Sequence, residues 1–347
     1  MVDRSKMPDR SDTPFEKWAL TEGIPIVRGY YVANAYEVPL KPWKRKGGLG
    51  ALIVLEGGEG FSSAYICEIP PGESLKPQRH LFEEKIFILQ GKGESRIWYE
   101  SEKAQTFSWQ ENALFSPPLN VWHQHINTGK QPVKYVAVTD APLVFNTYGN
   151  EDFIFGDNFM FKDRYNGQAD YFDGKGRMLN KTTWAGGFIP DARKPFLDET
   201  TEYGQGFKVL SVELSENKMG SHLAQIEVGV YKKPHRHAAG AHLIITEGTG
   251  YALMWYDWDK KVKADFQRGT IYCPPEQWWH THCNTGSQPV KQIALRCGIP
   301  GIGKIYQQRL GIKKGGDMLE REDEPPQVRK LFEDELAKKG LKSTITW

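Results

Sequence analysis

The stretch HRHAAGAHLIITEGTG at residues 235–250, together with WHTHCN at 279–284, decides the fold of this chain. Each stretch has an earlier counterpart, QRHLFEEKIFILQGKG at 78–93 and WHQHIN at 122–127, and both counterparts lie 157 residues upstream. Self-similarity at one constant step indicates repeated structural units. The sequence therefore predicts two related modules, of which the second keeps the fuller set of histidines.

Composition excludes several classes of protein. The 347 residues are 39% hydrophobic and 12% aromatic, enough for two domains with sizeable cores. The net charge of +2 offers no electrostatic footprint for a nucleic-acid partner. No apolar run approaches the roughly 20 residues of a membrane span, and the N-terminus has no signal-peptide pattern. The four cysteines form no CxxC motif, so we expect a reduced, cytoplasmic protein.

Both modules consist of short runs with high β-propensity, separated by turn residues such as Pro71-Gly72 and Gly91-Lys92-Gly93. Many short, evenly spaced strands are typical of an all-β barrel or sandwich. The strands predicted in the first module cover residues 51–55, 63–69, 85–89, 95–99, 113–116 and 133–138. The resulting division of the chain is an extension (1–49), a first barrel (50–145), a linker (146–205), a second barrel (206–300) and a tail (301–347).

Short helices are expected near both ends of the chain. Thr13-Pro14-Phe15-Glu16 resembles a capping box that begins a helix over 14–22, which Gly23 ends. A second helix is predicted over 326–339, with Gly340 after it and one apolar face. The linker is too long for a bare loop, so we expect it to pack on both barrels. The aromatic residues expected to do so are Phe153, Phe155, Phe159, Phe161, Tyr165 and Trp184.

The histidines of the second module have the spacing of metal ligands. Side chains two apart on a strand share a face, so His235 and His237 point the same way. His280 and His282 are again two apart, and either of them could complete a site across the barrel. Neutral imidazole suits zinc, copper, iron and nickel. An HxH pair followed by WHxHxN is less typical of structural histidines than of a metal site.

These motifs, with glycine turns and a histidine three residues before an asparagine, resemble the two motifs of the cupin superfamily. The resemblance covers about 50–145 and 206–300 and implies a bicupin, with two tandem jelly-roll barrels and a metal inside the barrel. The usual cupin site adds a glutamate to three histidines. In the first module the four equivalent positions are Gln78, His80, Glu84 and His123. In the second module alanine stands at 241, which leaves His235, His237 and His280 as a three-histidine site.

Among cupins, the second module resembles the ring-cleaving dioxygenases of the gentisate 1,2-dioxygenase type. The resemblance implies that Fe(II) is bound by His235, His237 and His280. It assigns His282 to proton transfer as a second-shell acid or base. Three neutral ligands leave the charge of a divalent ion uncompensated, which favours an anionic substrate. They also leave coordination positions of the ion open, so that substrate and dioxygen could both bind to it. In that family, however, the principal site lies in the first barrel.

Several other residues receive less specific interpretations. Because the amide of Gln78 is a poor ligand, the first module is expected to hold a weaker site or none. His242 lies one residue beyond the glutamate position, so it should face away from the site, as an outer residue or at the surface. His125 and Glu83 are interpreted as polar lining or surface. The basic run Lys44-Arg45-Lys46 is interpreted as a solvated loop.

The sequence therefore leads to three functional hypotheses. The first is a metal-dependent bicupin oxygenase, a non-haem Fe(II) dioxygenase acting on a small phenolic acid or hydroxy acid, with dioxygen as the second substrate. The second is a non-oxidative decarboxylase, lyase or isomerase, and the third is a small-molecule-binding protein without catalysis. Manganese, nickel, copper or zinc are alternatives to iron, and a homo-oligomer is expected.

Overall fold

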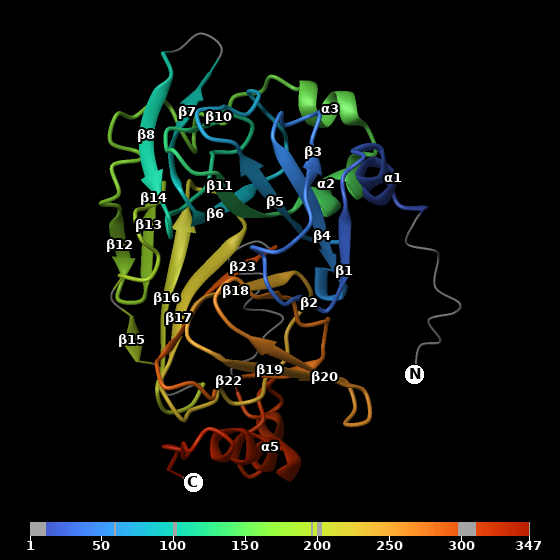
Figure 1. The fold of residues 1–347 in the computed structure, drawn as a ribbon, viewed down its shortest axis with the longest axis vertical. Coiled ribbons are helices and arrows are strands. Elements are labelled where there is room, and N and C mark those ends of the chain that lie inside the picture. The colour runs from blue at the N-terminus through green and yellow to red at the C-terminus, as the bar shows by residue number, and fades with distance from the viewer. Residues whose placement is uncertain are drawn as a thin grey trace.

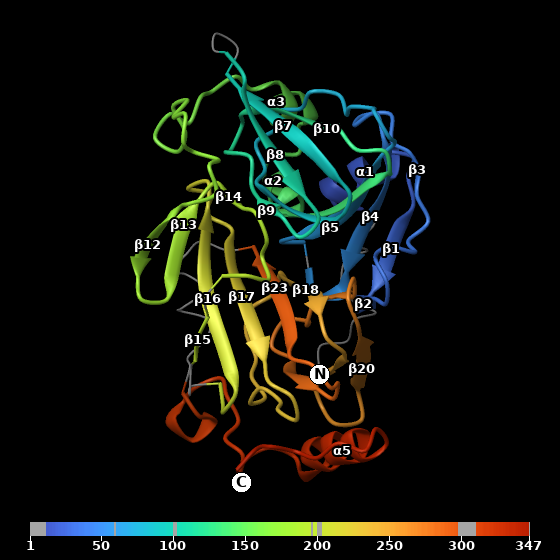
Figure 2. The same cartoon turned by 60° about the vertical axis from the view of Figure 1, so that its left-hand side comes forward.

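Two β-barrels lie one above the other along the long axis of the molecule, the first in blue and cyan and the second in yellow and orange (Figure 1). A view turned by 60° shows the same stacking (Figure 2). The computed structural model describes residues 12–58, 60–99, 103–195, 197–199, 203–297 and 310–346. The predicted all-β fold with two tandem barrels is confirmed.

The first barrel is built from a large and a small sheet. In the large sheet the order is β1-β4-β5-β11-β6-β9-β14, with β3 paired to β4, and in the small sheet it is β10-β7-β8. The large-sheet strands are β1 (Ile26–Gly29), β3 (Lys41–Pro42), β4 (Leu49–Leu55), β5 (Ser63–Ile69), β6 (Glu84–Gln90), β9 (Leu114–Phe115), β11 (Val133–Thr139) and β14 (Phe188–Ile189). The small sheet contains β7 (Lys92–Trp98), β8 (Gln105–Gln110) and β10 (Trp122–Asn127).

The second barrel repeats this plan. Its large sheet runs β12-β13-β16-β17-β23-β18-β21-β2, with β15 paired to β16, and its small sheet runs β20-β19-β22. The large-sheet strands are β2 (Tyr31–Val32), β12 (Arg177–Asn180), β13 (Thr183–Gly186), β15 (Asp198–Glu199), β16 (Phe207–Leu214), β17 (Gly220–Ile226), β18 (Ala241–Glu247), β21 (Ile271–Tyr272) and β23 (Val290–Arg296). The small sheet contains β19 (Gly250–Trp255), β20 (Lys261–Phe266) and β22 (Trp279–Asn284). The central order β5-β11-β6-β9 thus returns as β17-β23-β18-β21.

The predicted terminal helices are present. Helix α1 (Pro14–Thr21) begins at Thr13, whose Oγ1 accepts the backbone N–H of Glu16 at 3.3 Å. It packs beside α2 (Ala141–Tyr148) and α3 (Glu151–Gly156) at the end of the first barrel. Helix α5 (Pro326–Ala337) buries Val328, Phe332 and Leu336 against the second barrel. Short 3₁₀ turns are η3 (Glu56–Gly58) and η4 (Ile312–Lys314). Within the described residues, each helix is too short or too polar to span a bilayer.

The extension and the linker are parts of the barrels rather than separate segments. From the extension, β1 pairs with β4 of the first barrel and β2 with β21 of the second. From the linker, β14 pairs with β9 of the first barrel and β13 with β16 of the second. Parts of the predicted extension and tail, residues 1–11 and 301–309, lie outside the described residues. The expected packing of the linker on both barrels is therefore realised mainly through strand pairing.

The linker aromatics divide into buried and exposed residues. Tyr165 is buried in the core of the first barrel, Phe155 packs against that core, and Trp184 packs against the core between the barrels. Phe153 and Phe159 are 42% and 61% exposed, so their predicted packing role was wrong. Both lie where the chain turns at or just after the short helix α3, and one turn of helix buries only one of its faces.

The two large sheets pack against each other, so each is buried on both faces. Along β6, Ile86 and Ile88 belong to the core inside the first barrel, whereas Phe87 and Leu89 belong to the core between the barrels. Along β18, Leu243 and Ile245 face the inside of the second barrel, and Ile244 faces the other barrel. Because side chains alternate along a strand, every second residue faces the inside of its own barrel and the residues between them face the other barrel.

This interface also buries two polar side chains, those of His242 and Lys85. His242 shares the face of Ile244, is fully buried, and lies 3.3 Å through Nδ1 from Oγ of Ser62 in the first barrel. It faces away from the second barrel's interior as predicted, but its placement at the surface was wrong because the other barrel covers this face. Lys85 is buried in the same way and donates to Oγ of Ser221 at 3.0 Å.

Glu83 joins the linker to both barrels. Its carboxylate accepts from Arg164 at 2.7 Å and from the backbone N–H groups of Lys218 and Met219 at 2.8 and 2.7 Å. The side chain is 5% exposed, so its interpretation as surface was wrong. A buried carboxylate with three donors holds elements together, which fixes the first barrel relative to the second.

Candidate metal centre

Backbone hydrogen bonds bring the two histidine motifs of the second barrel together. His235 and His280 exchange N–H···O bonds of 3.0 and 2.8 Å and form an antiparallel bridge. Their ring centroids are 4.2 Å apart, and those of His237 and His280 are 4.6 Å apart. One ligand nitrogen from each of these three buried imidazoles lies within 4.8 Å of the other two. The structure thus brings together the three residues that the sequence selected.

Each of the three imidazoles is oriented by a backbone carbonyl. The pairs are Nδ1 of His235 with Lys233 O at 3.0 Å, His237 with Ala238 O at 2.7 Å, and His280 with Trp278 O at 3.0 Å. A carbonyl can only accept, so each hydrogen bond requires the proton on Nδ1 and leaves a lone pair on Nε2. Such carbonyl contacts are the usual support of metal-ligating histidines.

Electrostatics keep these imidazoles neutral. Burial, then the charges of Lys232 and Arg296, lower the pKa of His280 to about 3. Burial also holds the pKa values of His235 and His237 well below the ordinary range. Metal ligation needs deprotonated nitrogen, so the three side chains are ready to bind an ion at neutral pH without releasing protons. The buried Nε2 of His280 has no hydrogen-bond partner among the described residues, as expected of an atom reserved for a ligand.

His282 lies beside this cluster and belongs to a hydrogen-bonded chain. Its ring centroid is 5.5 Å from that of His280, and its Nδ1 is 2.7 Å from the hydroxyl of Tyr272. That hydroxyl in turn donates to Oε1 of Gln292 at 3.2 Å. With the Tyr272 proton directed to Gln292, the phenolic oxygen accepts from Nδ1–H of His282, and Nε2 keeps a lone pair. Burial holds the pKa of His282 well below its ordinary value.

One further residue of this cluster, Lys232, has no signal in the sequence. Lys232 is 5% exposed, and its Nζ lies 3.0 Å from Nε2 of His235. The ammonium also lies over the rings of Tyr203 and Phe207, 3.9 and 4.9 Å from their centroids. The sequence holds two adjacent lysines here, and nothing in their order distinguishes the buried Lys232 from its neighbour. A flexible four-carbon side chain can reach the cluster without any periodic pattern.

The first barrel holds a second cluster, formed by two histidines and a glutamate. His80, Glu84 and His123 are all buried and offer ligand atoms within 4.8 Å of one another. Nδ1 of His80 lies 2.7 Å from the Phe82 carbonyl, and Nδ1 of His123 lies 3.0 Å from that of Val121. Both Nε2 lone pairs therefore face Glu84, at 3.8 and 3.2 Å from its carboxylate oxygens. Hydrogen-bond acceptors that face one another attract a positive charge into the space between them. Either a proton or a metal ion can provide that charge.

Gln78 does not turn its oxygen to this cluster. Its Oε1 accepts from Nζ of Lys46 at 2.6 Å, and Lys46 also lies 4.6 Å from the ring centroid of Tyr65. Lys46 is only 5% exposed, so the interpretation of its loop as fully solvated was wrong. Burial raises the pKa of Glu84, but the charge of Lys46 and the contact with His123 outweigh it, so this pKa lies well below its ordinary value. The first barrel thus contains a cation of its own.

His125 lines the inside of the first barrel. Of the two interpretations from the sequence, polar lining or surface, the first is therefore correct. It is 3% exposed, its ring centroid lies 5.6 Å from that of His123, and its Nδ1 is 2.8 Å from Oγ of Ser95. Ser95 Oγ also accepts from Trp109 Nε1 at 2.8 Å. The Ser95 hydroxyl thus contacts both side chains, and this fixes the orientation of the His125 ring.

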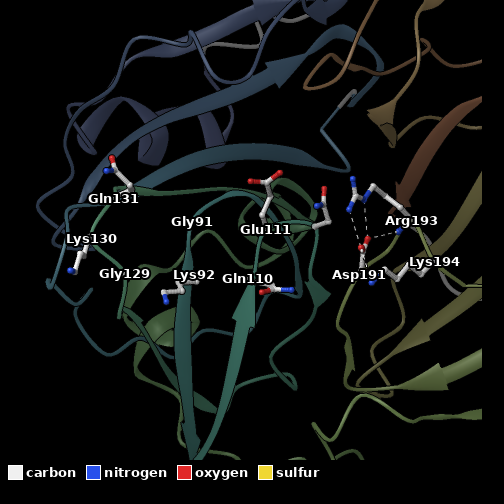
Figure 3. A pocket seen from close by; sticks show the side chains of 11 residues that line it. Gly91, Lys92, Gln110, Glu111, Gly129, Lys130, Gln131, Asp191, Arg193 and Lys194 are labelled. Atoms are coloured by element: carbon white, nitrogen blue, oxygen red, sulfur yellow. Dashed lines mark hydrogen bonds and ion pairs between the residues drawn. The ribbon is translucent and has the colours of Figure 1, made fainter. Parts of the chain in front are cut away.

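An open hollow of about 530 Å³ lies away from both clusters, where turns of the first barrel meet the linker. Figure 3 shows Arg193 paired with Asp191 on one side and Lys92 and Lys130 on the other. Its lining residues are Gly91, Lys92, Gln110, Glu111, Asn112, Gly129, Lys130, Gln131, Asp191, Arg193 and Lys194. None of the clustered histidines lines it, so it is a surface feature distinct from the candidate centre.

Comparison with known proteins agrees with this architecture. A cupin domain model matches residues 65–139. A structure of oxalate decarboxylase superposes with a TM-score of 0.53 at 14% identity, over 79% of this chain and 78% of that one. A structure of the Bacillus subtilis oxalate decarboxylase concerned with its Mn(II) centres gives a TM-score of 0.51 at 15% identity, over 79% and 78% of the two chains.

A further relative is similar over a shorter stretch. Gentisate 1,2-dioxygenase from a Haloferax species is 28% identical over 90 residues. The match spans about a quarter of either protein, 24% of this chain and 24% of that one. Fold and site together define a two-barrel protein with a histidine cluster inside each barrel. The chain contains a cupin domain over residues 65–139, and its fold of two stacked barrels is that of the oxalate decarboxylase structures.

Proposed function

We propose that this bicupin is a metal-dependent oxygenase whose ion is held in the second barrel by His235, His237 and His280. The observation that supports this most is the convergence of three buried imidazoles, each of which donates its Nδ1–H to a backbone carbonyl and keeps the Nε2 lone pair for an ion. Imidazole nitrogen suits iron, nickel, copper and zinc. Manganese, the ion named for an oxalate decarboxylase structure of the same fold, is a further candidate. Iron(II) is the preferred ion because its bound form supplies the activation of dioxygen.

The substrate is a small acid with two neighbouring oxygens, a phenolic acid or a hydroxy acid. Three neutral ligands provide no negative charge, so an anionic substrate compensates the ion where other cupins use a glutamate. Alanine at 241 leaves that position without a carboxylate. His282 is the proposed proton carrier, because its Nε2 can accept a hydroxyl proton from the substrate while Tyr272 and Gln292 stabilise the protonated ring.

The first barrel is proposed as a weaker second site. His80, Glu84 and His123 could hold an ion, but Lys46 already lies beside Gln78 and adds a positive charge. The second candidate function is a non-oxidative decarboxylase, lyase or isomerase, which the fold shared with oxalate decarboxylase supports. A bicupin that binds a small molecule without catalysis is the third candidate. A cytoplasmic location and a homo-oligomeric state remain predictions from the sequence.

The test is oxygen uptake by protein loaded anaerobically with Fe(II) and offered gentisate, salicylate and small hydroxy acids. Uptake that depends on the acid and disappears in His280→Ala supports the oxygenase. The control variant is His123→Ala, which removes the corresponding ligand of the first barrel and should keep most of the uptake. Turnover without dioxygen, with release of carbon dioxide from oxalate, would establish the non-oxidative function instead.

A further inference from the structure

The open hollow beside the linker has walls that the fold holds in place. Its volume of about 530 Å³ is that of a small-molecule site. One wall is the linker segment 191–194, where the N–H of Ala192 donates to the carbonyl of Asn112 at 2.9 Å. Nζ of Lys291 donates to the carbonyl of Arg193 at 3.0 Å. The other walls are three turns of the first barrel, at 91–92, 110–112 and 129–131.

The acidic side chains that line this hollow are already paired. Asp191 accepts from Nε and Nη2 of Arg193, at 3.0 Å each. Glu111 pairs at 2.7 Å with Arg268, which lies outside the lining. Two neutralised carboxylates leave little negative charge for the other cations of the hollow. Its lysines therefore determine the charge that a ligand would meet.

Two of these lysines lie together on one side. Lys92 and Lys130 are exposed, and neither makes an ion pair or a side-chain hydrogen bond within the described residues. A Cβ placed on Gly129 would lie 3.3 Å from Cγ of Lys92, so the Lys92 side chain lies against the turn that carries Lys130. Figure 3 shows both lysines on one side of the hollow and Arg193 and Lys194 on the other. The hollow thus offers positive charge on two sides.

The internal repeat shows that these turns do not require lysine. The turn at Gly91 returns at Gly248, with φ of +88° and +82°, so the two barrels share its backbone geometry. The two lysines do not return, because Thr249 and Ser287 stand at the positions 157 residues downstream. Both barrels thus build the turns with glycine, and only the first adds the positive charges. Such an addition is typical of residues that bind a ligand rather than stabilise a turn.

This distribution of charge favours a ligand with more than one negative group. Carboxylate and phosphate oxygens both accept charge-assisted hydrogen bonds from ammonium groups. A molecule with one such group can contact one side of the hollow, whereas a molecule with two or more can contact both. The side-chain amides of Gln110 and Gln131 lie in the lining and can donate further hydrogen bonds.

We propose that the hollow is a binding site for a small polyanion, a molecule with at least two carboxylate or phosphate groups. Lys92 and Lys130 hold one end of this molecule and Lys194 holds the other. The site is separate from both histidine clusters, so the inference does not depend on the proposed metal centre.

Exposed lysines elsewhere in the chain provide a matched control. The double variant Lys92→Gln with Lys130→Gln removes two positive charges from the hollow. The double variant Lys41→Gln with Lys181→Gln removes two from exposed positions that do not line it. Both variants have the same net charge, so any non-specific attraction of anions falls equally in the two. Lys92→Arg with Lys130→Arg keeps the charge and serves as the conservative variant.

The experiment is calorimetric titration with inorganic pyrophosphate and with tricarballylate, and with acetate as the monovalent comparison. Wild type should bind at least one polyanion saturably, and acetate much more weakly. The glutamine variant of Lys92 and Lys130 should bind that polyanion about tenfold more weakly, because two charge-assisted contacts are lost. The control and arginine variants should match wild type. Preference for one probe distinguishes a phosphate ligand from a polycarboxylate.

Polyanions also bind metal ions, so each titration is repeated with His280→Ala, which should behave as wild type. Binding that disappears in His280→Ala would place the polyanion on the proposed ion and overturn the inference. Equal losses in the two glutamine variants would also overturn it, because binding would then follow net charge alone. Failure of both polyanions to bind wild type saturably would exclude the site outright, and it would leave the proposed metal centre unaffected.

Discussion

His242 should make the stability of this protein depend on pH between neutrality and pH 5. The imidazole is fully buried between the barrels, and burial lowers its pKa from the ordinary 6.5 to about 4. As the pH falls, protons bind the unfolded chain before they bind the folded one. The contribution of His242 is therefore fully present above about pH 7 and is lost as the pH falls through 6.5 towards 4.

The magnitude follows from the two pKa values. Between pH 7 and pH 5 the unfolded chain takes up nearly one proton more at this site than the folded chain, which corresponds to a loss of about 2 kcal/mol. The assay is equilibrium unfolding in urea, followed by tryptophan fluorescence, with chelator present so that bound metal does not contribute. His242→Gln should lose about 2 kcal/mol less than wild type between these two pH values.

The control is Ser62→Ala, which removes the hydrogen-bond partner of His242 but keeps the titrating ring. It should lower stability by a similar amount at both pH values and leave the pH dependence unchanged. The reasoning is refuted if His242→Gln and wild type lose equal stability between pH 7 and pH 5. That outcome would mean that His242 is accessible to protons in the folded protein.

Three further substitutions test the packing. Tyr272→Phe removes a buried hydroxyl bonded to the proposed proton carrier and should lower the unfolding free energy by about 1–3 kcal/mol in urea; an unchanged value would exclude that hydrogen bond. Burial lowers the pKa of Lys85 to about 8, so between pH 8 and 10 wild type should gain about 2 kcal/mol relative to Lys85→Met, and parallel curves would argue against a buried ammonium. A Cβ at Gly57 would overlap the backbone carbonyl of Cys273, so Gly57→Ala should cost roughly 1–3 kcal/mol or more by thermal unfolding. Gly156→Ala, which meets no neighbour, should be near neutral, and equal melting temperatures for the two variants would contradict the packing.

Spacing predicted that His235 and His237 share a face and that His280 or His282 completes their cluster, and the cupin resemblance selected His280. Side chains two apart on an extended segment share a face, and the constant repeat step aligns the WHxH strand with the HxH segment of its own module. The cupin resemblance also selected Glu84, which lies inside the first barrel on the same face of its strand as Ile86. Periodicity is reliable here because both motifs lie in extended backbone held by hydrogen bonds.

The lysines could not be predicted in this way. Lys46 and Lys232 lie in loops beside the strands, where no period fixes the direction of a side chain, and both reach inward through flexible stems. Sequence reasoning treats such residues as solvated because lysine is rarely buried. Their positions depend on aromatic neighbours from distant segments, Tyr65 for Lys46 and Tyr203 for Lys232.

The residues between the barrels do follow a recognisable sequence pattern. Strands β6 and β18 read EKIFILQ and AHLIITE, which are nearly continuous apolar runs rather than alternating ones. Such runs are typical of strands buried on both faces. That pattern predicts that the outward face of each strand is covered, which is where Lys85 and His242 lie. Alternation gave the direction of the His242 side chain, but only the apolar run indicates that it is buried.

The most direct test of the proposed centre is the metal content of wild type, His280→Ala and His123→Ala, each purified without added metal or chelator. Wild type and His123→Ala should each hold about one tightly bound ion per chain, and His280→Ala should hold none, because the second barrel provides three neutral imidazole ligands. An ion that remains in His280→Ala and disappears in His123→Ala would contradict the account and place the centre in the first barrel.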